Sequence, residues 1–217
     1  YRDIAERTDG DVYIGVVGPV RTGKSTLISR MMEKLVMESM SPGPKRDRIA
    51  DELPQSASGK TIMTTQPKFV PSEAVTVSLD DQATVRVRMV DSVGYMVDGA
   101  LGTEEDGTAR MVHTPWFDYD IPFDQAAEIG TRKVMTDHPT IGLVVTTDGT
   151  IADLPRDSYA APEERVVQEL KQLGKPFIIV LNSKAPQDSA AQQLRQKMSD
   201  RYQVPVLAVN AKEMELE

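Results

Sequence analysis

Short apolar runs alternate with amphipathic stretches along most of this chain. Residues 11–17 (DVYIGVV) form a nearly continuous apolar run, which is typical of a strand covered on both faces. From Ser25 to about Met40 the apolar residues recur at helical spacing, and residues 42–44 (PGP) end that pattern. The first 40 residues therefore predict a strand, a glycine-containing loop and a helix, in that order.

The pattern is weaker in the middle of the chain. Residues 41–73 are polar and contain prolines, so we expect a long surface loop there. Alternating apolar residues predict a hairpin of two strands, 74–79 and 84–90, around a polar turn. Residues 95–123 have no sustained period and predict an ordered insert or a mobile loop.

Regular alternation of strands and helices returns in the second half. We expect strands at 140–147, 176–182 and 204–210 and helices at 124–136, 162–173 and 189–202. This order indicates an α/β fold, a mostly parallel sheet with helices on both faces, to which the hairpin adds one antiparallel strand.

The loop after the first strand reads GPVRTGKS and satisfies the pattern G-x-x-x-x-G-K-[ST]. An accidental match is expected in about one chain in a hundred of this length. The glycines let backbone N–H groups point at a phosphate, Lys24 can neutralise phosphate oxygens, and the Ser25 hydroxyl can ligate Mg²⁺. We therefore expect a GTPase-like P-loop NTPase, with these residues at the nucleotide: Gly18, Val20, Arg21, Thr22, Gly23, Lys24, Ser25 and Thr26.

The run from Asp91 to Gly94 (DSVG) directly follows the hairpin and precedes the long insert. Asp91 would stand at the carboxyl end of a strand, where open α/β sheets place ligand-binding residues. Its carboxylate can hold Mg²⁺ directly or through water, and the Gly94 N–H can sense a γ-phosphate. A plain turn after a strand is the alternative.

Three threonines, Thr61, Thr64 and Thr65, lie between the P-loop helix and the Asp91 strand. One of them could close over Mg²⁺ and the γ-phosphate as an order–disorder switch, or all could belong to an edge strand. The residues do not decide between Thr64 and Thr65. The predicted metal ligands are Ser25, Asp91 and Thr65, and the predicted catalytic residues are Lys24, Thr64, Thr65, Asp91 and Arg21.

Base recognition is predicted at Asn182-Ser183-Lys184-Ala185, where switch GTPases have Asn-Lys-x-Asp. The lysine is displaced and the guanine-binding aspartate is missing, which favours ATP or weak discrimination. Asn182 and Lys184 remain predicted nucleotide contacts. A guanine-specific switch would need another acid, such as Asp188.

Tyr95 stands where many GTPases carry a water-orienting glutamine. We expect hydrolysis to be slow, or to be completed by another subunit. Arg21, inside the P-loop, either supplies a positive charge to the transferring phosphate or points into solvent.

Aromatic residues also gather in the insert, at Trp116, Phe117, Tyr119 and Phe123. They predict a packed satellite core, with a protein-contact surface as the alternative.

The composition narrows the class of protein. With 25 Lys and Arg against 33 Asp and Glu the net charge is −8, and no basic run suggests a nucleic-acid partner. There are no cysteines to form disulfides or zinc sites, and no apolar run approaches the ~20 residues of a membrane span. We expect a cytoplasmic domain. Because the chain begins at Tyr1 and stops where an α/β domain usually adds another helix, we also expect residues 1–217 to be a fragment of a longer protein.

Several long runs of the chain are not generic to P-loop proteins. They are residues 3–8 (DIAERT), 18–26 (GPVRTGKST), 51–56 (DELPQS), 59–65 (GKTIMTT), 67–71 (PKFVP), 114–116 (TPW), 126–134 (AAEIGTRKV) and 146–150 (TTDGT). In these runs, which span essentially the whole chain, the sequence resembles the bacterial stage IV sporulation protein A family, spore-coat morphogenetic ATPases of the TRAFAC class. The resemblance implies that residues 1–217 are the N-terminal ATPase domain of a longer protein.

The resemblance implies Mg²⁺-dependent ATP hydrolysis that drives self-association into polymers, which form a basement layer of the spore coat. It further implies a small amphipathic membrane-anchoring partner, other coat proteins as partners, and a location in the mother-cell cytoplasm at the outer surface of the forespore. The rival functions are a GTPase switch, a nucleotide-binding scaffold without turnover and, with least support, a small-molecule kinase.

Overall fold

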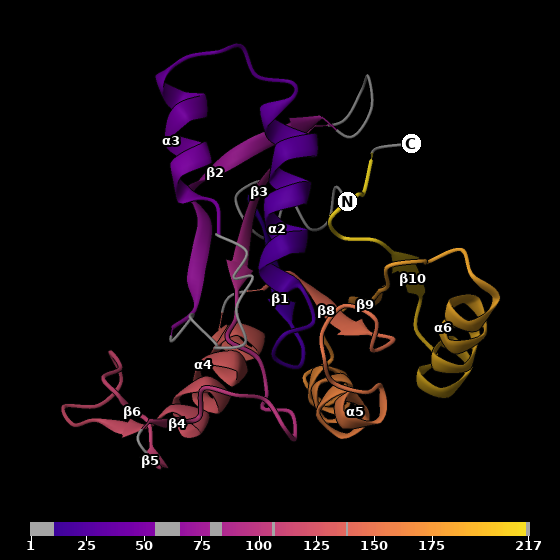
Figure 1. Cartoon of the computed structure of the whole chain (residues 1–217). Coiled ribbons are helices and arrows are strands. Elements are labelled where there is room, and N and C mark those ends of the chain that lie inside the picture. Colours follow the sequence, from indigo (N-terminus) through magenta and orange to yellow (C-terminus); the bar gives the residue numbers. More distant parts are fainter. Residues whose placement is uncertain (1–10, 55–65, 79–83, 106, 138, 216–217) are drawn as a thin grey trace.

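A six-stranded sheet forms the centre of the protein (Figure 1). The computed structural model describes residues 11–54, 66–78, 84–105, 107–137 and 139–215. The strand order is β10-β9-β8-β1-β3-β2, and every neighbouring pair is parallel except β2 with β3. The strands are β1 (Asp11–Val17), β2 (Lys68–Ser78), β3 (Thr84–Asp91), β8 (Ile141–Thr147), β9 (Phe177–Asn182) and β10 (Val206–Val209). The predicted α/β sheet with one antiparallel strand is confirmed.

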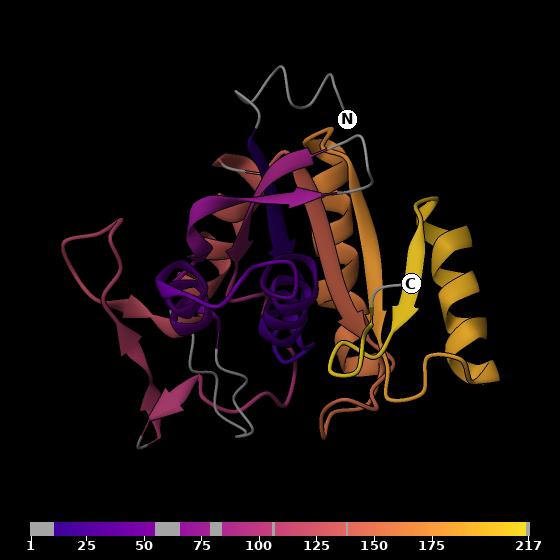
Figure 2. The same cartoon turned by 90° about the horizontal axis from the view of Figure 1, so that it is seen from above.

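Helices cover both faces of this sheet (Figures 1 and 2). One set comprises α2 (Lys24–Met32), the π-helical segment η1 (Glu33–Met37) and α3 (Pro44–Glu52). The other comprises α4 (Phe123–Asp137), α5 (Asp157–Gln172) and α6 (Ser189–Tyr202). Successive strand residues face opposite sides, so Val16 packs into the core beneath α2 and Val17 into the core beneath α4, α5 and α6. The apolar runs of the sequence are strands buried on both faces, as predicted.

The first helix has the predicted extent, but it widens into the π-helical segment η1 after Met32. The expectation of a long surface loop from residue 41 to 73 is wrong in two places. Helix α3 lies within it because Pro44 occupies a helix start and Ile49, 1% exposed, anchors an otherwise polar helix to the core. Strand β2 begins at Lys68, six residues early, because a bulge between Val70 and Val75 lets an irregular stretch stay paired with β3.

Helix α5 begins at Asp157, five residues before the predicted start at Pro162. The extra first turn forms because Tyr159 is fully buried, and its N–H donates to the Arg156 carbonyl at 3.0 Å. Pro162 therefore lies inside the helix.

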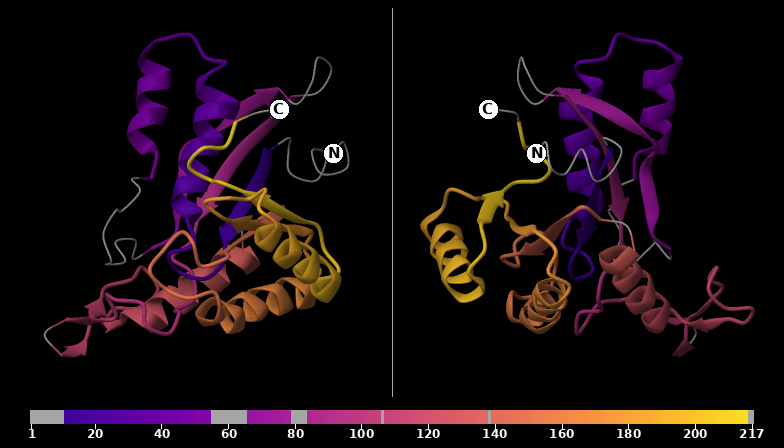
Figure 3. Two further views of the ribbon diagram at one scale, coloured as in Figure 1. Left: turned by 45° about the vertical axis from the view of Figure 1, so that its right-hand side comes forward. Right: turned by 180° about the vertical axis from the view of Figure 1, so that it is seen from behind.

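The insert projects from the body beside α4 (Figure 3). It holds two small hairpins, β4 (Glu104–Glu105) with β5 (Thr108–Ala109) and β6 (Met111–Val112) with β7 (Ile121–Pro122). Of the four aromatic residues predicted to form this core, all of them within the described residues, Phe123 is buried. Tyr119 is 63% exposed beside Phe117, with ring centroids 5.3 Å apart. The predicted satellite core is thus wrong for Tyr119.

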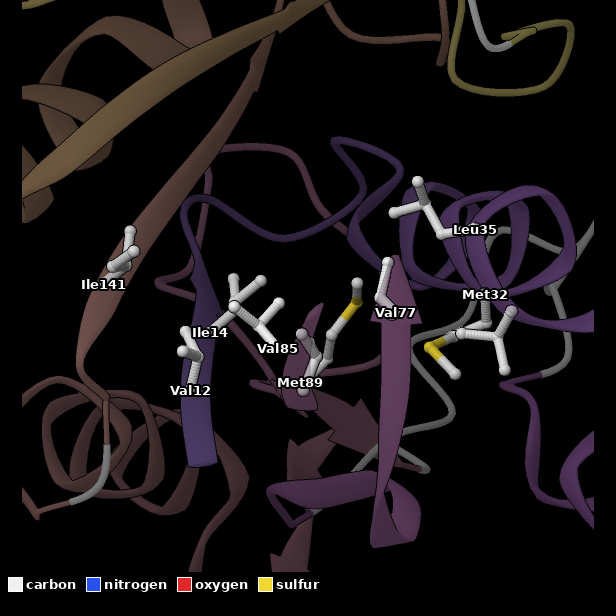
Figure 4. Close-up of a pocket in the computed structure, with 10 residues that line it drawn as sticks. Val12, Ile14, Met32, Leu35, Val77, Val85, Met89 and Ile141 are labelled. Atoms are coloured by element: carbon white, nitrogen blue, oxygen red, sulfur yellow. The ribbon is translucent and has the colours of Figure 1, made fainter. Parts of the chain in front are cut away.

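An apolar cavity of about 140 Å³ lies between the sheet and the α2–η1 segment (Figure 4). Its walls include Val12, Ile14 and Ile141 from the beginnings of β1 and β8, together with Met32 and Leu35. Because parallel strands β1 and β8 begin here, the cavity lies at the opposite end of the sheet from the P-loop. Within the part of the chain that the structure describes, no helix has the length and apolar character that crossing a membrane requires.

Candidate nucleotide-binding site

The loop from Gly18 to Gly23 joins β1 to α2 and lies tightly against β8 and β9. Gly18 has φ 141°, and a Cβ there would stand 2.1 Å from the Val145 carbonyl oxygen. Gly23 has φ 87°, and its Cβ would stand 2.3 Å from Nδ2 of Asn182. Only glycine fits either position, so both glycines of the motif serve close packing as well as backbone curvature.

The N-terminus of α2 is prepared for an anion. Gly23 is its N-cap and has no side chain to bond the first N–H groups, and the first turn, which includes Thr26, contains no acid. These N–H groups and the helix dipole together favour a phosphate. Arg21, one residue before Thr22, has φ 60°, a left-handed conformation that a non-glycine residue adopts at a cost.

Lys24, Ser25 and Asp91 meet at the carboxyl end of the sheet. The Lys24 ammonium is buried and donates to the Pro19 carbonyl at 2.7 Å. Burial lowers the pKa of Lys24 to about 8, and the negative charge of Asp91 partly opposes that shift. The Ser25 hydroxyl donates to Oδ2 of Asp91 at 2.7 Å. The strand-end position predicted for Asp91 is therefore the one it has.

The second oxygen of Asp91 shows whether the site fits a metal ion. Oδ1 of Asp91 is buried and has no hydrogen-bond partner among the described residues. Burial is also the main cause that raises the pKa of Asp91, against the Ser25 hydrogen bond and Lys24, which lower it. One carboxylate and one hydroxyl beside a phosphate cradle fit Mg²⁺, which uses few protein ligands and completes its shell with phosphate and water.

The turn after Asp91 is paired with the P-loop. The Tyr95 N–H donates to the Gly18 carbonyl at 3.2 Å, and the Val20 N–H donates to the Tyr95 carbonyl at 2.9 Å. The Gly94 N–H donates to Oγ1 of Thr131 on α4 at 2.9 Å. Val20 is also 1% exposed, so it supports the loop from beneath in a small core that includes Phe123.

Tyr95 has a partner far from the P-loop. Its hydroxyl donates to Oε2 of Glu169 on α5 at 2.5 Å, and the Arg165 guanidinium lies 4.3 Å from its ring centroid. Burial and the Glu169 hydrogen bond raise the pKa of the phenol, so it stays protonated. The residue at the glutamine position is thus tied to α5.

The base-binding end is held by Asn182. Its Nδ2 donates to the Thr22 carbonyl at 3.0 Å, and its Oδ1 accepts the Ala211 N–H at 3.0 Å. Lys184 and Ala185 follow as exposed residues, and the stem of Lys184 is available to lie against a base. Asp188 is the N-cap residue of α6, three positions beyond Ala185. No carboxylate replaces the missing one at position 185 itself.

The structure therefore brings together the motif residues Gly18 to Ser25, with Asp91, Gly94 and Asn182. Thr61, Thr64 and Thr65 lie outside the described residues, so their predicted closure over Mg²⁺ and γ-phosphate stays a prediction.

The family model for the stage IV sporulation protein A ATPase domain matches residues 1–217. The chain belongs to this family. It is 56% identical over 217 residues to Stage IV sporulation protein A of Clostridioides difficile (strain 630) and 55% identical over 214 residues to that of Bacillus subtilis (strain 168). Those alignments cover 100% and 99% of this chain and 44% of each relative, so the chain spans less than half the length of these relatives. GTPase Der of Bifidobacterium longum (strain NCC 2705) is 28% identical over 102 residues, which are 46% of this chain and 22% of that protein.

In this member of the stage IV sporulation protein A family, sequence reasoning missed one group at the base-binding end. The Ala211 N–H follows β10 and positions Asn182. This contact could have been anticipated from the sequence. The predicted strands are parallel and end at one edge of the sheet, so the residues that follow the last strand must lie at that edge as well.

A buried ion pair that braces the same edge was also missed. Glu163, 1% exposed, pairs with Arg156 at 2.6 Å and accepts hydrogen bonds from the Thr146 and Tyr202 hydroxyls. The Thr150 hydroxyl accepts the Lys184 N–H at 3.0 Å, so the loop after β8 is joined to the base-binding end. Neither contact has a sequence motif, because the partners come from separate elements.

Proposed function

We propose that this chain binds Mg²⁺-ATP and hydrolyses it, and that the resulting conformational change drives self-assembly of a spore-coat basement layer. One observation carries the chemical part. The Ser25 hydroxyl lies 2.7 Å from Asp91, whose other oxygen is buried without a partner among the described residues, next to the buried Lys24. Membership of the stage IV sporulation protein A family, through its ATPase domain, supports the same function.

Each residue has a role that follows from its place. The N–H groups at the start of α2 and the Lys24 ammonium hold the β- and γ-phosphates, and Lys24 has two further N–H donors besides the one that bonds the Pro19 carbonyl. Ser25 and Asp91 would hold Mg²⁺, which when bound neutralises charge on the β- and γ-oxygens. The Gly94 N–H would meet the γ-phosphate. Arg21, Thr64 and Thr65 remain candidates for completing the site.

ATP is favoured over GTP by the base-binding end. Guanine recognition needs a carboxylate to accept its two N–H donors, and Ala185 stands in that position. Asn182 keeps its structural bonds to Thr22 and Ala211, so the pocket is formed without the guanine-specific group.

A nucleotide-binding scaffold without turnover is the second candidate. It is favoured by Tyr95, whose hydroxyl is held by Glu169 on α5 instead of facing the phosphates. In that case a water-orienting group would have to come from another copy or from a partner.

For the whole protein we propose self-association into polymers in the mother-cell cytoplasm at the outer surface of the forespore. We further propose a small amphipathic membrane-anchoring protein and other coat proteins as partners. Sedimentation of the full-length protein with ATP, with ADP and without nucleotide tests the first part, because the proposal requires ATP to raise the pelleted fraction.

Phosphate release from Mg²⁺-ATP and Mg²⁺-GTP tests the chemistry. We expect release from ATP to exceed release from GTP and to fall to background in Lys24→Ala, because the phosphate loses its main cation. Lys45→Ala, an exposed lysine of α3, is the matched control and should keep full activity. Binding of ATP without release above the Lys24→Ala background would favour the scaffold.

A further inference from the structure

The Gly94 amide already has a partner in this structure. Its N–H donates to Oγ1 of Thr131 at 2.9 Å, and the bond is buried. Thr131 lies on α4, is fully buried and comes 37 positions later in the chain. The proposed function needs this same amide for the γ-phosphate.

Gly94 lies directly against the phosphate cradle. It has φ 102°, and a Cβ added there would stand 2.6 Å from the Lys24 ammonium nitrogen and 2.6 Å from the Gly18 carbonyl oxygen. The turn is held at this distance by the Tyr95 and Val20 backbone bonds to the P-loop. A phosphate that reaches Lys24 therefore comes close to the Gly94 amide.

A single amide hydrogen makes one well-aligned hydrogen bond, so Thr131 and a phosphate oxygen compete for it. The two groups of the Gly94–Thr131 bond differ in whether they have another partner when the bond breaks. A threonine in a helix can turn its hydroxyl to the carbonyl one turn earlier, so Thr131 has an alternative partner when Gly94 leaves. The buried Gly94 amide has no comparable alternative on its own segment, and an unpaired buried donor is costly.

We propose that Thr131 determines how strongly the site prefers a nucleoside triphosphate to a diphosphate, by competing with the γ-phosphate for the Gly94 amide. This inference rests on the proposed function, which assigns that amide to the γ-phosphate. With a diphosphate or no nucleotide, Gly94 stays bonded to Thr131. With a triphosphate, the bond is exchanged, and part of the γ-phosphate's binding energy is offset by the loss of the Thr131 bond.

Thr131→Val tests the competition because it keeps the shape of the side chain and removes the acceptor. In the variant the amide is unpaired unless a γ-phosphate is present, so the triphosphate state gains relative to the diphosphate state. We expect the ratio of Kd for ADP to Kd for a non-hydrolysable ATP analogue to rise about tenfold. Thr131→Ser, which restores the hydroxyl, should return the ratio to that of the wild type. Thr136→Val, on the exposed side of the same helix, should leave it unchanged.

Hydrogen exchange of the Gly94 amide, followed by NMR without nucleotide, tests the bond itself. Exchange should be faster in Thr131→Val than in the wild type, and Thr131→Ser should restore the protection. Unchanged exchange in Thr131→Val overturns the inference. Faster exchange with an unchanged Kd ratio overturns the competition while leaving ATP binding intact. Failure of the wild type to bind either nucleotide overturns the proposed function, and the competition with it. Thermal unfolding of each variant identifies any loss of folding.

Discussion

The phosphate-binding and base-binding ends of the candidate site lie at one edge of the sheet. They differ in how many of the side chains expected of a switch GTPase are present. The phosphate end combines backbone N–H groups with Lys24, Ser25 and Asp91. Ser25 donates a hydrogen bond to Asp91, and Lys24 lies near enough to Asp91 for that negative charge to raise the pKa of Lys24. The base end keeps Asn182 in a fully bonded position and has Ala185 where a guanine-binding acid would stand. Asn182 braces the P-loop, whereas the side chain at position 185 braces nothing in the described structure. A specificity group at a solvent-exposed loop position can therefore change while the frame of the site stays intact.

Of the changes considered, Asp91→Asn should reduce phosphate release the most, because it removes a predicted Mg²⁺ ligand from the phosphate end and leaves the base end unchanged. The amide can still accept the Ser25 hydrogen bond, but it lacks the charge that Mg²⁺ needs. We expect Mg²⁺-dependent phosphate release to fall about 100-fold. Release measured across a Mg²⁺ titration checks this, with the exposed insert residue in Asp118→Asn as the control. Wild-type rates in Asp91→Asn would remove Asp91 from the metal site.

Asn182→Ala should weaken both ends at once. It leaves the buried N–H of Ala211 and the carbonyl of Thr22 unpaired, which costs about 2 kcal/mol of folding free energy. We expect a lower melting temperature and about tenfold weaker binding of ATP and GTP alike. Asn182→Asp keeps the acceptor for Ala211 but sets a buried carboxylate oxygen against the Thr22 carbonyl, so it should not restore the stability. If Asn182→Ala weakened only one of the two nucleotides, Asn182 would be a base-reading residue and not a brace.

Ala185→Asp places a carboxylate at the position where switch GTPases have their guanine-binding aspartate, and so tests the base end alone. Because Ala185 is exposed, the change should not disturb packing. We expect the affinity for GTP relative to ATP to rise about tenfold, since charged hydrogen bonds to guanine become possible. The uncharged variant Ala185→Asn should shift the ratio less. Competition binding with both nucleotides measures it, and an unchanged ratio in Ala185→Asp would mean that another group reads the base.

A change of pH should have the smallest effect and should act on the phosphate end. The Lys24 pKa is lowered to about 8, so the ammonium loses its proton as the pH rises through 8 in the unliganded protein. A bound phosphate favours the charged form, and binding therefore takes up a proton in this range. We expect ATP affinity to fall about threefold from pH 7.5 to 8.5. Lys24→Arg, which stays charged, should give a flat profile in isothermal titration, and a flat profile in the wild type would contradict the shifted pKa.

Sequence reasoning predicted the fold well where the pattern is periodic. Strand β1 and helix α6 have the predicted bounds, because β1 is one nearly continuous apolar run and the buried residues of α6, Ala191, Met198 and Tyr202, recur at helical spacing. Helix α3 was missed because a single residue, Ile49, anchors it, and one buried residue makes no period. The start of α5 was missed because the burial of Tyr159 by distant residues outweighed the local signal of Pro162.

The phosphate cradle of this protein is predictable from its amino-acid sequence alone. A glycine loop between a strand and a helix, ending in Lys24 and Ser25, is a local signal whose chemistry needs only neighbouring residues. The absence of an acid at position 185 is also visible in the sequence, because the position is located by counting from the end of a predicted strand.

The surroundings of the cradle depend on how the elements pack in three dimensions. Gly94 meets Thr131 across 37 positions, Tyr95 meets Glu169 across 74, and Thr22 meets Asn182 across 160. These pairs form because the sheet brings the ends of its parallel strands, and the helices that follow them, to one edge. No spacing along the chain encodes such a meeting, so the side chains that hold Gly94 and Tyr95 away from a phosphate become visible only when the elements are packed together.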